Sequence, residues 1–397
     1  MTDILYAMIR RDMTARLKAA AQDFPAVTVT GPRQSGKSTL CRAVFPKHPY
    51  ANLEEPDVRS FALRDPRAFL AAYPKGAIID EIQRCPDLPS YLQVLIDKDR
   101  SPGRWILTGS QNLALLQSVS QSLAGRTAVF HLLPLTHSEV CRFKQHPDDL
   151  DGTMLAGGYP CIFEERHTPS RWLSSYVDTY IERDVRTITN IGDLTTFQRF
   201  VELCAGRTAQ LLNLSTLATD AGISQPTARA WLSVLETSFI TFRLPPFFAN
   251  IRKRLVKMPK LHFYDTGLVC WLLGIHTADQ FRNHPLRGFI FESWVVSEVI
   301  KHRANNGQYR GVFFFRDRHG LEADVIVDHG DRYDIAEAKA GQTASPDMLR
   351  PIRQIGELLE KLRPVDACVV YGGSSGQKNT AISLVPWDKL HTRRWAR

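Results

Sequence analysis

The chain has 397 residues, 44% of them hydrophobic and 23% charged, a composition that is ordinary for globular proteins and suggests two or three domains. No apolar run approaches the ~18 residues of a membrane span, and the first residues lack the basic-then-apolar order of a signal peptide, so we expect a cytoplasmic protein without a membrane partner. The seven cysteines form no C-x-x-C pair, which argues against a zinc site or a disulfide framework. The net charge of +9 permits a nucleic-acid partner without establishing one.

The first informative segment is amphipathic. Residues 8–18 repeat apolar residues at helical spacing and are expected to form a helix that leads into the first strand. We expect its basic residues to be a solvated face and not a binding site. The strand is expected at 26–30, a short β-branched run.

Residues 31–39 match the phosphate-binding loop G-x-x-x-x-G-K-[ST] at every fixed position. Glycines let the backbone curl so that N–H groups point at phosphates, Lys37 would reach the β and γ oxygens, and Ser38 would ligate Mg²⁺. An apolar strand precedes the loop and a segment compatible with a helix follows it, as the motif requires. The sequence therefore predicts that ATP contacts Gly31, Pro32, Arg33, Gln34, Ser35, Gly36, Lys37, Ser38 and Thr39.

A second apolar run, at 77–79, ends in two carboxylates. Asp80 is placed where it can hold Mg²⁺ through water, and Glu81 where it can polarise the attacking water. The alternative is a strand end with two solvated acids, but the upstream loop favours the functional interpretation. Hydrolysis of ATP, and not binding alone, is implied.

A third apolar run, at 105–107, is followed by small polar residues. Ser110 and Asn112 are candidates for a group that touches the γ-phosphate or its attacking water, although a polar turn would explain either residue alone. Arg126 follows at a turn before the strand-like segment 129–133. An arginine there could supply charge to the transition state in cis or across a subunit interface, whereas a lone arginine is more often a surface residue.

Together these motifs resemble those of the archaeal-type AAA+ ATPases, prokaryotic proteins with a C-terminal domain of unknown function. The resemblance runs over most of the chain and rests on the phosphate loop, Ile-Ile-Asp80-Glu81-Ile-Gln, Leu-Thr-Gly-Ser110, Leu-Ala-Gly-Arg126, Leu-Pro-Leu-Thr-His-Ser-Glu139 and Gly157-Gly-Tyr-Pro160. It implies a parallel sheet of the ASCE type. It also implies that Ser110 is the γ-phosphate sensor and Arg126 the candidate arginine finger.

Past a polar stretch at 142–152, which suggests a domain boundary, the sequence becomes helical. One long helix is expected from an apolar or aromatic stripe that core packing explains: Trp172, Tyr176, Tyr180, Ile181 and Val185.

Residues 214–235 have helix-turn-helix spacing around Gly222. If this unit reads DNA, the residues that face a major groove would be Gln225, Thr227 and Arg229. Winged-helix units of this kind also serve only to pack or dimerise, and the two possibilities stay open here. Phosphate contact is slightly favoured by basic residues in the next segment, Arg252, Lys253, Arg254 and Lys257.

The C-terminal part predicts a second site. A helix expected at 289–302 carries Glu292 and Glu298, only one of which can readily face a given site. A β-hairpin follows, and a turn at Gly330-Asp331 pairs Asp328 with Tyr333.

This register places Asp324 opposite Glu337, at about 5 Å between Cβ atoms, and Lys339 points the same way. Like charges on one face invite a compensating cation, and oxygen ligands suit Mg²⁺ or Mn²⁺.

The spacing from Asp324 to Glu337-x-Lys339 resembles the PD-(D/E)xK nuclease core. The resemblance implies that Asp324 and Glu337 are metal ligands, that Lys339 orients or activates water, and that Glu292 or Glu298 is the helical acid. A solvent-facing hairpin decorated with charges is the alternative, and a metal site can also persist without activity.

We therefore expect a P-loop α/β ATPase domain at 1–150, a helical and winged-helix-like region at 151–285, and a restriction-endonuclease-like α/β domain at 286–397. The expected cofactors are ATP and Mg²⁺, with Mn²⁺ possible at the C-terminal site; DNA, a homo-oligomer and a protein partner are the partners considered. The expected function is ATP hydrolysis that drives or gates action on DNA, including metal-dependent cleavage. The alternatives are an ATP-switched DNA-binding regulator with an inert nuclease fold, and an ATP-dependent scaffold or signalling protein.

Overall fold

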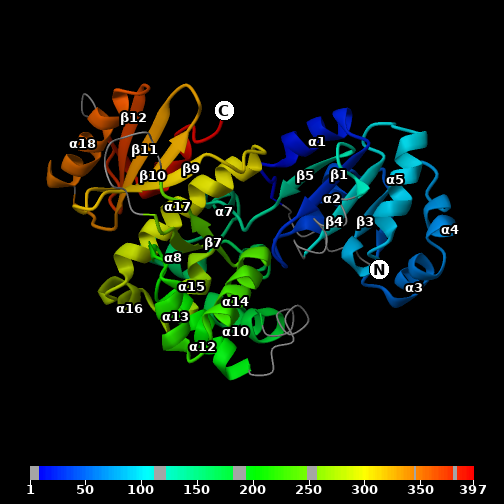
Figure 1. Ribbon diagram of the computed structural model, residues 1–397, viewed down its shortest axis with the longest axis horizontal. Helices are drawn as coiled ribbons and strands as arrows, with labels where there is room; N and C mark the ends of the chain where they lie inside the picture. Colours follow the sequence, from blue (N-terminus) through cyan, green and yellow to red (C-terminus); the bar gives the residue numbers. More distant parts are fainter. Residues whose placement is uncertain (1–8, 111–121, 182–193, 248–256, 344–345, 379–381) are drawn as a thin grey trace. The chain divides into compact units, whose positions relative to one another are not determined.

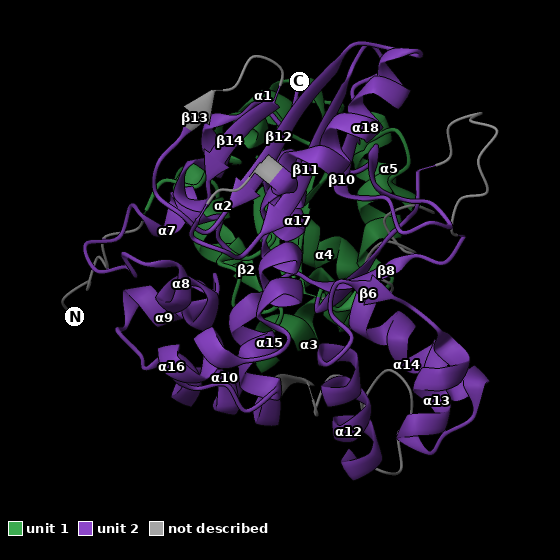
Figure 2. Ribbon diagram, turned by 90° about the vertical axis from the view of Figure 1, so that its left-hand side faces the viewer, with its two compact units in different colours: residues 1–134, 237–239, 304–307 green, residues 135–236, 240–303, 308–397 purple. Residues whose placement is uncertain are grey.

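The computed structural model describes residues 9–110, 122–181, 194–247, 257–343, 346–378 and 382–397 (Figure 1). The chain divides into two compact units, coloured separately in Figure 2. Unit 1 comprises residues 1–134, 237–239 and 304–307, and unit 2 comprises 135–236, 240–303 and 308–397. The three domains expected from the sequence, with boundaries after residues 150 and 285, stay predictions. Among the described helices, none is both long and apolar enough to cross a lipid bilayer.

Unit 1 is built on a five-stranded sheet whose neighbouring strands all pair in parallel. The strand order is β2-β3-β4-β1-β5, with β1 (Ala26–Thr30), β2 (Tyr50–Asn52), β3 (Ala77–Asp80), β4 (Trp105–Gly109) and β5 (Thr127–His131). Because the strands run the same way, their carboxyl ends meet at one edge of the sheet. The predicted parallel sheet is thus confirmed, and the phosphate loop directly follows β1.

Helices cover both faces of this sheet (Figure 1). On one face, α1 (Thr14–Asp23) and α2 (Lys37–Val44) form a core with alternate strand residues such as Val27 and Ile106. On the other face, α3 (Pro56–Arg64), α4 (Pro66–Ala71) and α5 (Leu88–Lys98) enclose Trp105 and Leu107. The near-continuous apolar strands are what a sheet buried on both faces requires.

Unit 2 begins with short helices: α7 (His137–Val140), α8 (Leu150–Ala156), α9 (Pro160–Glu164), α10 (Pro169–Tyr176), α12 (Leu194–Ala205), α15 (Thr266–Leu272) and α16 (Ala278–Asn283). The long helix expected from Trp172 begins as α10 and continues after Tyr176 as a π-helix over Val177–Ile181, so its helical repeat is not regular. Within that turn the Thr179 hydroxyl donates to the Ser175 carbonyl at 2.5 Å, which competes with the regular backbone bond. Core packing of the stripe holds for Trp172 and Tyr176, whose rings stack at 5.0 Å; Val185 lies outside the described residues.

The two helices expected at 214–235 are α13 (Leu214–Ala221) and α14 (Gln225–Thr237). Gly222 ends α13 with φ of 73°, a conformation that suits glycine. They are followed by β7 (Thr241–Leu244) and β8 (Lys260–Phe263), which join β6 (Gln210–Leu211) in a three-stranded antiparallel sheet. Arg252, Lys253 and Arg254 lie outside the described residues.

The C-terminal part of unit 2 is a six-stranded mixed sheet with the order β13-β14-β12-β11-β10-β9. Its strands are β9 (Val312–Arg316), β10 (Glu322–Asp328), β11 (Tyr333–Lys339), β12 (Val365–Tyr371), β13 (Gln377–Lys378) and β14 (Ile382–Pro386). β10 and β11 pair antiparallel with Asp328 opposite Tyr333, so the predicted hairpin register is confirmed. The long helix α17 (Arg287–Asn305) precedes the sheet, and α18 (Leu349–Glu360) packs on it through Ile352 and Ile355.

Candidate nucleotide-binding site and acidic cluster

The phosphate loop connects β1 to the amino terminus of α2. Gly31 and Gly36 have positive φ values of 153° and 87°, and a Cβ atom on Gly31 would lie 2.2 Å from the Leu132 carbonyl oxygen. Glycine is therefore needed at Gly31 both for conformation and for space. The loop leads into α2, whose first-turn N–H groups lack helical partners and favour an anion.

Lys37 is buried at the start of α2, and its ammonium donates to the carbonyl oxygens of Gly31 at 3.1 Å and Pro32 at 2.7 Å. Burial lowers its pKa to about 8, although Glu81 and Asp80 oppose that shift. A phosphate would supply the negative charge that favours the protonated form of such an ammonium. The role of Lys37 in phosphate binding stays a prediction.

Asp80 ends β3 and is held by donors from both neighbouring strands. The Tyr50 hydroxyl of β2 donates to Oδ2 at 2.5 Å, the Thr108 hydroxyl of β4 donates to Oδ1, and the Glu81 backbone N–H donates to Oδ1 at 3.1 Å. Burial and the bond to Asp80 raise the pKa of Tyr50, while the Ser38 hydroxyl opposes that rise. Tyr50 and Thr108 were not predicted, although both are polar residues in strands that run to the same edge.

Glu81 follows with a positive φ of 56°. Its Oε2 accepts hydrogen bonds from Ser110 Oγ at 3.0 Å and from the Gln83 side-chain amide. Ser110 is fully buried directly after β4, so the structure brings together the predicted water-activating acid and the predicted sensor. Asn112 lies outside the described residues.

Arg126 lies at the opposite end of the sheet. It precedes β5, whose first residue pairs with Ala26, and its carbonyl oxygen accepts from the Ala26 N–H at 3.2 Å. Its guanidinium binds both carboxylate oxygens of Asp97, at 2.7 and 2.8 Å. Because β1 is five residues long, about 15 Å of strand separates Arg126 from the phosphate loop. The catalytic role of Arg126 stays a prediction.

Arg11 contradicts the expectation that the basic residues of 8–18 form a solvated face. It is 5% exposed, and its guanidinium donates to the carbonyl oxygens of Ser35 at 2.8 Å and Leu133 at 3.0 Å. Arg16 and Lys18 of the same segment are exposed as expected. Arg11 therefore fastens the phosphate loop to the chain that follows β5.

The residues of this edge fit a magnesium nucleotide. The Ser35 hydroxyl is buried within the loop and has no hydrogen-bond partner in the described chain, so a ligand oxygen would satisfy it. Ser38 and Asp80 offer the oxygen donors that Mg²⁺ prefers, and Lys37 offers the charge that phosphates need.

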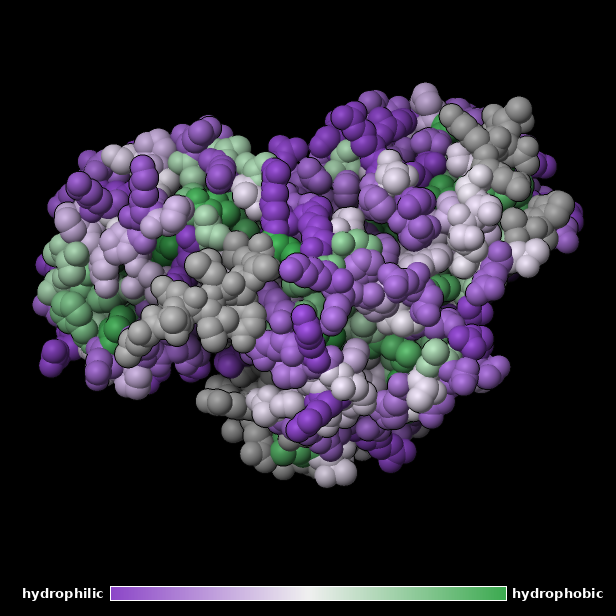
Figure 3. All heavy atoms as spheres, turned by 180° about the vertical axis from the view of Figure 1, so that it is seen from behind, coloured by the Kyte–Doolittle hydropathy of each residue, from purple (hydrophilic) through white to green (hydrophobic). Residues whose placement is uncertain are grey.

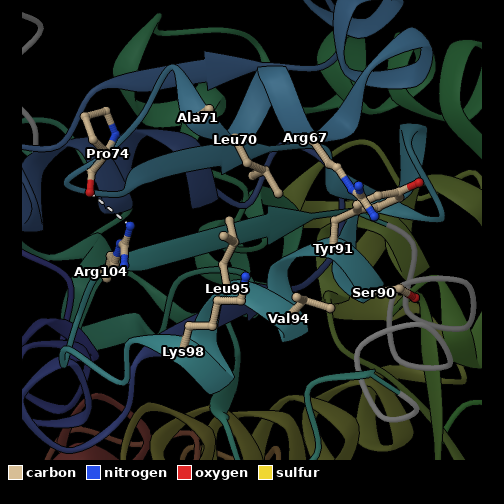
Figure 4. Close-up of a pocket in the computed structure, with 10 residues that line it drawn as sticks. All are labelled: Arg67, Leu70, Ala71, Pro74, Ser90, Tyr91, Val94, Leu95, Lys98 and Arg104. Carbon is tan, nitrogen blue, oxygen red and sulfur yellow. Dashed lines mark hydrogen bonds between the residues drawn. The ribbon is translucent and has the colours of Figure 1, made fainter.

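A separate pocket of about 810 Å³ lies on unit 1 between α4, α5 and the segment before β4 (Figure 4). Its lining combines apolar residues, such as Leu70 and Val94, with the bases Arg67, Lys98 and Arg104. Arg104 donates to the Pro74 carbonyl at 2.9 Å, and Arg67 lies over the Tyr91 ring. None of the lining residues belongs to the phosphate loop.

The molecular face in Figure 3 is mostly hydrophilic, with small hydrophobic patches.

The predicted acidic residues of the C-terminal hairpin do gather in unit 2. One step beyond the Val325–Ala336 pair, the register sets Asp324 opposite Glu337, and Asp324 Oδ2 accepts from the Ala338 N–H at 2.9 Å. Lys339 Nζ lies 2.7 Å from Glu337 Oε1, as its predicted orientation requires. Burial and the Asp324 charge raise the pKa of Glu337 to about 8.

The helical acid of this cluster is Glu292 and not Glu298. Burial and Asp324 raise the pKa of Glu292 well above its usual value. Glu298 instead accepts from the His137 backbone N–H at 2.8 Å and pairs with Lys301 at 3.2 Å. The two glutamates thus face different sites, as their helical spacing predicted.

Sequence reasoning missed Lys260 and Glu322, which also join this cluster. Lys260 Nζ lies 2.5 Å from Glu292 Oε1 and 2.6 Å from Glu322 Oε1. Burial alone would lower the pKa of Lys260, but Asp324, Glu292 and Glu322 outweigh it and raise the pKa. Among the described residues, no group of three or more His, Cys, Asp or Glu side chains is arranged to hold a metal ion. The metal assignment for Glu292, Asp324 and Glu337 stays a prediction.

Three family models match successive parts of the chain: an AAA domain over residues 23–141, a "Domain of unknown function (DUF8612)" over 147–279, and a "Domain of unknown function (DUF4143)" over 287–390. Among solved structures, the Walker-type ATPase PABY2304 of Pyrococcus abyssi is similar at 14% identity and a TM-score of 0.45, covering 66% of this chain and 95% of that one.

Curated relatives match over nearly the whole length. The uncharacterized proteins Mb2031c of Mycobacterium bovis and Rv2008c of Mycobacterium tuberculosis are each 32% identical over 387 residues, covering 96% of this chain and 85% of theirs. The uncharacterized protein MJ1544 of Methanocaldococcus jannaschii is 21% identical over 330 residues, covering 75% of this chain and 71% of its own. The chain therefore belongs to the family of the mycobacterial proteins Mb2031c and Rv2008c, as a member whose residues 23–141 form an AAA domain.

Proposed function

We propose that unit 1 hydrolyses ATP. The observation that carries this proposal is the joint position of Lys37, Asp80 and the Glu81–Ser110 pair at one edge of the parallel sheet. Lys37 would bind phosphate oxygens, and a Glu81 carboxylate oxygen would take the proton of the attacking water while Ser110 holds that carboxylate in orientation. Mg²⁺, held by Ser38 and Asp80, would offset the charge of the phosphates.

Two variants test this proposal. Lys37→Ala should lose most nucleotide binding, whereas Glu81→Gln should bind ATP and release phosphate at least ~100-fold more slowly, as expected for loss of a general base. Binding is measured with a fluorescent ATP analogue and turnover by phosphate release. Equal phosphate release by Glu81→Gln and the parent protein would reject Glu81 as the base.

We further propose that the nucleotide state gates binding to DNA. Two features support DNA as the partner: α14 exposes Gln225 and Arg229 in its first two turns, and the chain carries a net charge of +9. Of the two DNA-directed interpretations of the sequence, the buried Lys260 within the acidic cluster favours the regulator with an inert nuclease fold.

The same variants decide whether ATP and DNA are linked. Fluorescence anisotropy with labelled duplex should show tighter DNA binding by ATP-loaded Glu81→Gln than by Lys37→Ala, and Arg229→Ala should weaken it in either nucleotide state. Equal DNA binding by Glu81→Gln and Lys37→Ala would separate DNA from the ATP cycle. No DNA binding by any variant would favour a protein partner.

A further inference from the structure

The acidic cluster of unit 2 contains a buried ammonium. Lys260, the first residue of β8, has a side chain only 3% exposed, and its Nζ lies 2.5 Å from Glu292, 2.6 Å from Glu322 and 3.3 Å from Asp324. These three carboxylates come from α17 and β10. A single cation is therefore surrounded by acids from two different elements.

The Lys260 ammonium occupies the position that a divalent ion bound by these carboxylates would take. A lysine ammonium has three N–H donors and no acceptor, and three carboxylates lie within ion-pair distance of it. A metal ion bound by the same oxygens would lie within a few ångströms of Nζ, where the repulsion between two cations is poorly screened. Either Lys260 or the metal can hold this position, but not both.

The rest of the cluster is also close to charge balance. Arg316 pairs with Glu322 Oε2 at 3.2 Å, and Lys339 pairs with Glu337 Oε1 at 2.7 Å. Even with all four carboxylates counted as ionised, the three cations, Lys260 among them, leave only one negative charge. A dication added to this set would reverse the sign of the excess without removing it.

Withdrawal of Lys260 from the cluster would be costly. Its Nζ lies over the Phe314 ring, 5.4 Å from the ring centroid, and two of its partners, Glu292 and Asp324, are buried. Breaking a buried ion pair by removing one partner is strongly destabilising, because the remaining charge is uncompensated. The lysine is thus a fixed part of this site.

We propose that Lys260 supplies the cation of this cluster, so that the C-terminal site of the parent protein takes no divalent metal ion and becomes a divalent-cation site only when Lys260 is replaced by a neutral residue. The proposal holds whether or not unit 1 hydrolyses ATP. It also gives the cluster a positional role, because Lys260 belongs to the three-stranded sheet while its partners belong to α17 and the hairpin.

The test is equilibrium binding of Mn²⁺ to nucleotide-free full-length protein, with free Mn²⁺ measured by electron paramagnetic resonance. The parent and Asp324→Asn should bind the same number of Mn²⁺ ions. Lys260→Met should gain one Mn²⁺ per chain, and Lys260→Met with Asp324→Asn should lose that ion again. Lys260→Arg keeps the charge and should gain none.

Lys301→Met is the matched control. Lys301 is also a buried lysine of unit 2, 4% exposed, but it pairs with Glu298 at 3.2 Å and donates to the Leu135 carbonyl at 3.1 Å, away from the acidic cluster. Its loss should destabilise the fold without creating a Mn²⁺ site. Any Mn²⁺ ion of the parent that depends on Asp324 overturns the proposal, as does the absence of a gain in Lys260→Met. If Lys260→Met is too unstable in chelator for this titration, its unfolding temperature is measured with and without Mn²⁺ instead. An unfolding temperature that does not rise with Mn²⁺ would contradict the proposal.

Discussion

At the scale of single residues, replacing Thr108 should distinguish two functions of the site: the orientation of Asp80 and the binding of the nucleotide. Its buried hydroxyl donates to Asp80 Oδ1 but does not belong to the phosphate loop. Thr108→Val should leave ATP affinity near that of the parent and raise the Mg²⁺ concentration for half-maximal hydrolysis by about 10–100-fold, as for other partners of metal ligands. Thr108→Ser keeps the hydroxyl and should behave like the parent. A parallel loss of ATP affinity in Thr108→Val would show that the residue supports the fold of the site instead.

The residues that could be predicted lie close together in sequence or share a strand period. The phosphate loop is contiguous, and the hairpin register followed from a short turn, which set Asp324 opposite Glu337. Arg11 and Lys260 could not be predicted in this way. Their partners lie 24 and 122 residues away for Arg11, and 32 and 64 residues away for Lys260, so only the tertiary fold brings them together.

At the scale of elements, the sequence predicted the strands that lead to the phosphate loop and to Asp80, the two helices at 214–235 and the C-terminal hairpin, because apolar period and turn residues carry that information. The π-helix after α10 was not predicted, because the apolar period does not distinguish a π turn from an α turn; within it Thr179 donates to the Ser175 carbonyl. The position of Arg126 opposite the phosphate loop could have been predicted, because a residue before a strand of a parallel sheet lies at the amino edge, whereas the phosphate loop follows a strand.

The short helix α7 carries a pH-dependent contact. His137 is largely buried against the rings of Trp294 and Trp387, at 6.0 and 4.9 Å between centroids. Burial, aided by His391, lowers its pKa to about 4 from 6.5. Between these values the unfolded chain binds a proton that the folded chain does not, so the free energy of unfolding falls as pH falls from 6.5 to 4.

His137→Phe should preserve the aromatic packing and remove this proton. Urea unfolding at pH 7 and pH 5, followed by circular dichroism, should show a loss of stability on acidification that is smaller in His137→Phe by up to about 2 kcal/mol. A residual loss is expected because burial also lowers the pKa of His131 in unit 1 to about 4. The same acid sensitivity in the variant and the parent would place the proton uptake on other groups.

At the scale of the whole molecule, the position of Arg126 bears on assembly. Since it lies at the sheet end opposite the phosphate loop of its own chain, we propose that any γ-phosphate that Arg126 contacts belongs to a neighbouring copy. In the isolated chain it forms a two-pronged pair with Asp97 at the end of α5. Two roles are thus distinct: a finger that acts across an interface of a homo-oligomer, or a surface ion pair.

Asp97 provides the matched variant for this distinction. If Arg126 acts in trans, Arg126→Ala should lose at least ~1,000-fold in turnover while keeping ATP affinity, and Asp97→Ala should retain turnover because the guanidinium is still present. Mixing Arg126→Ala with Lys37→Ala should then restore part of the hydrolysis, since each chain supplies the half-site that the other lacks. Turnover is measured at a protein concentration where light scattering shows mixed oligomers. Equal, small effects of Arg126→Ala and Asp97→Ala, with no recovery on mixing, would leave Arg126 as a surface ion pair.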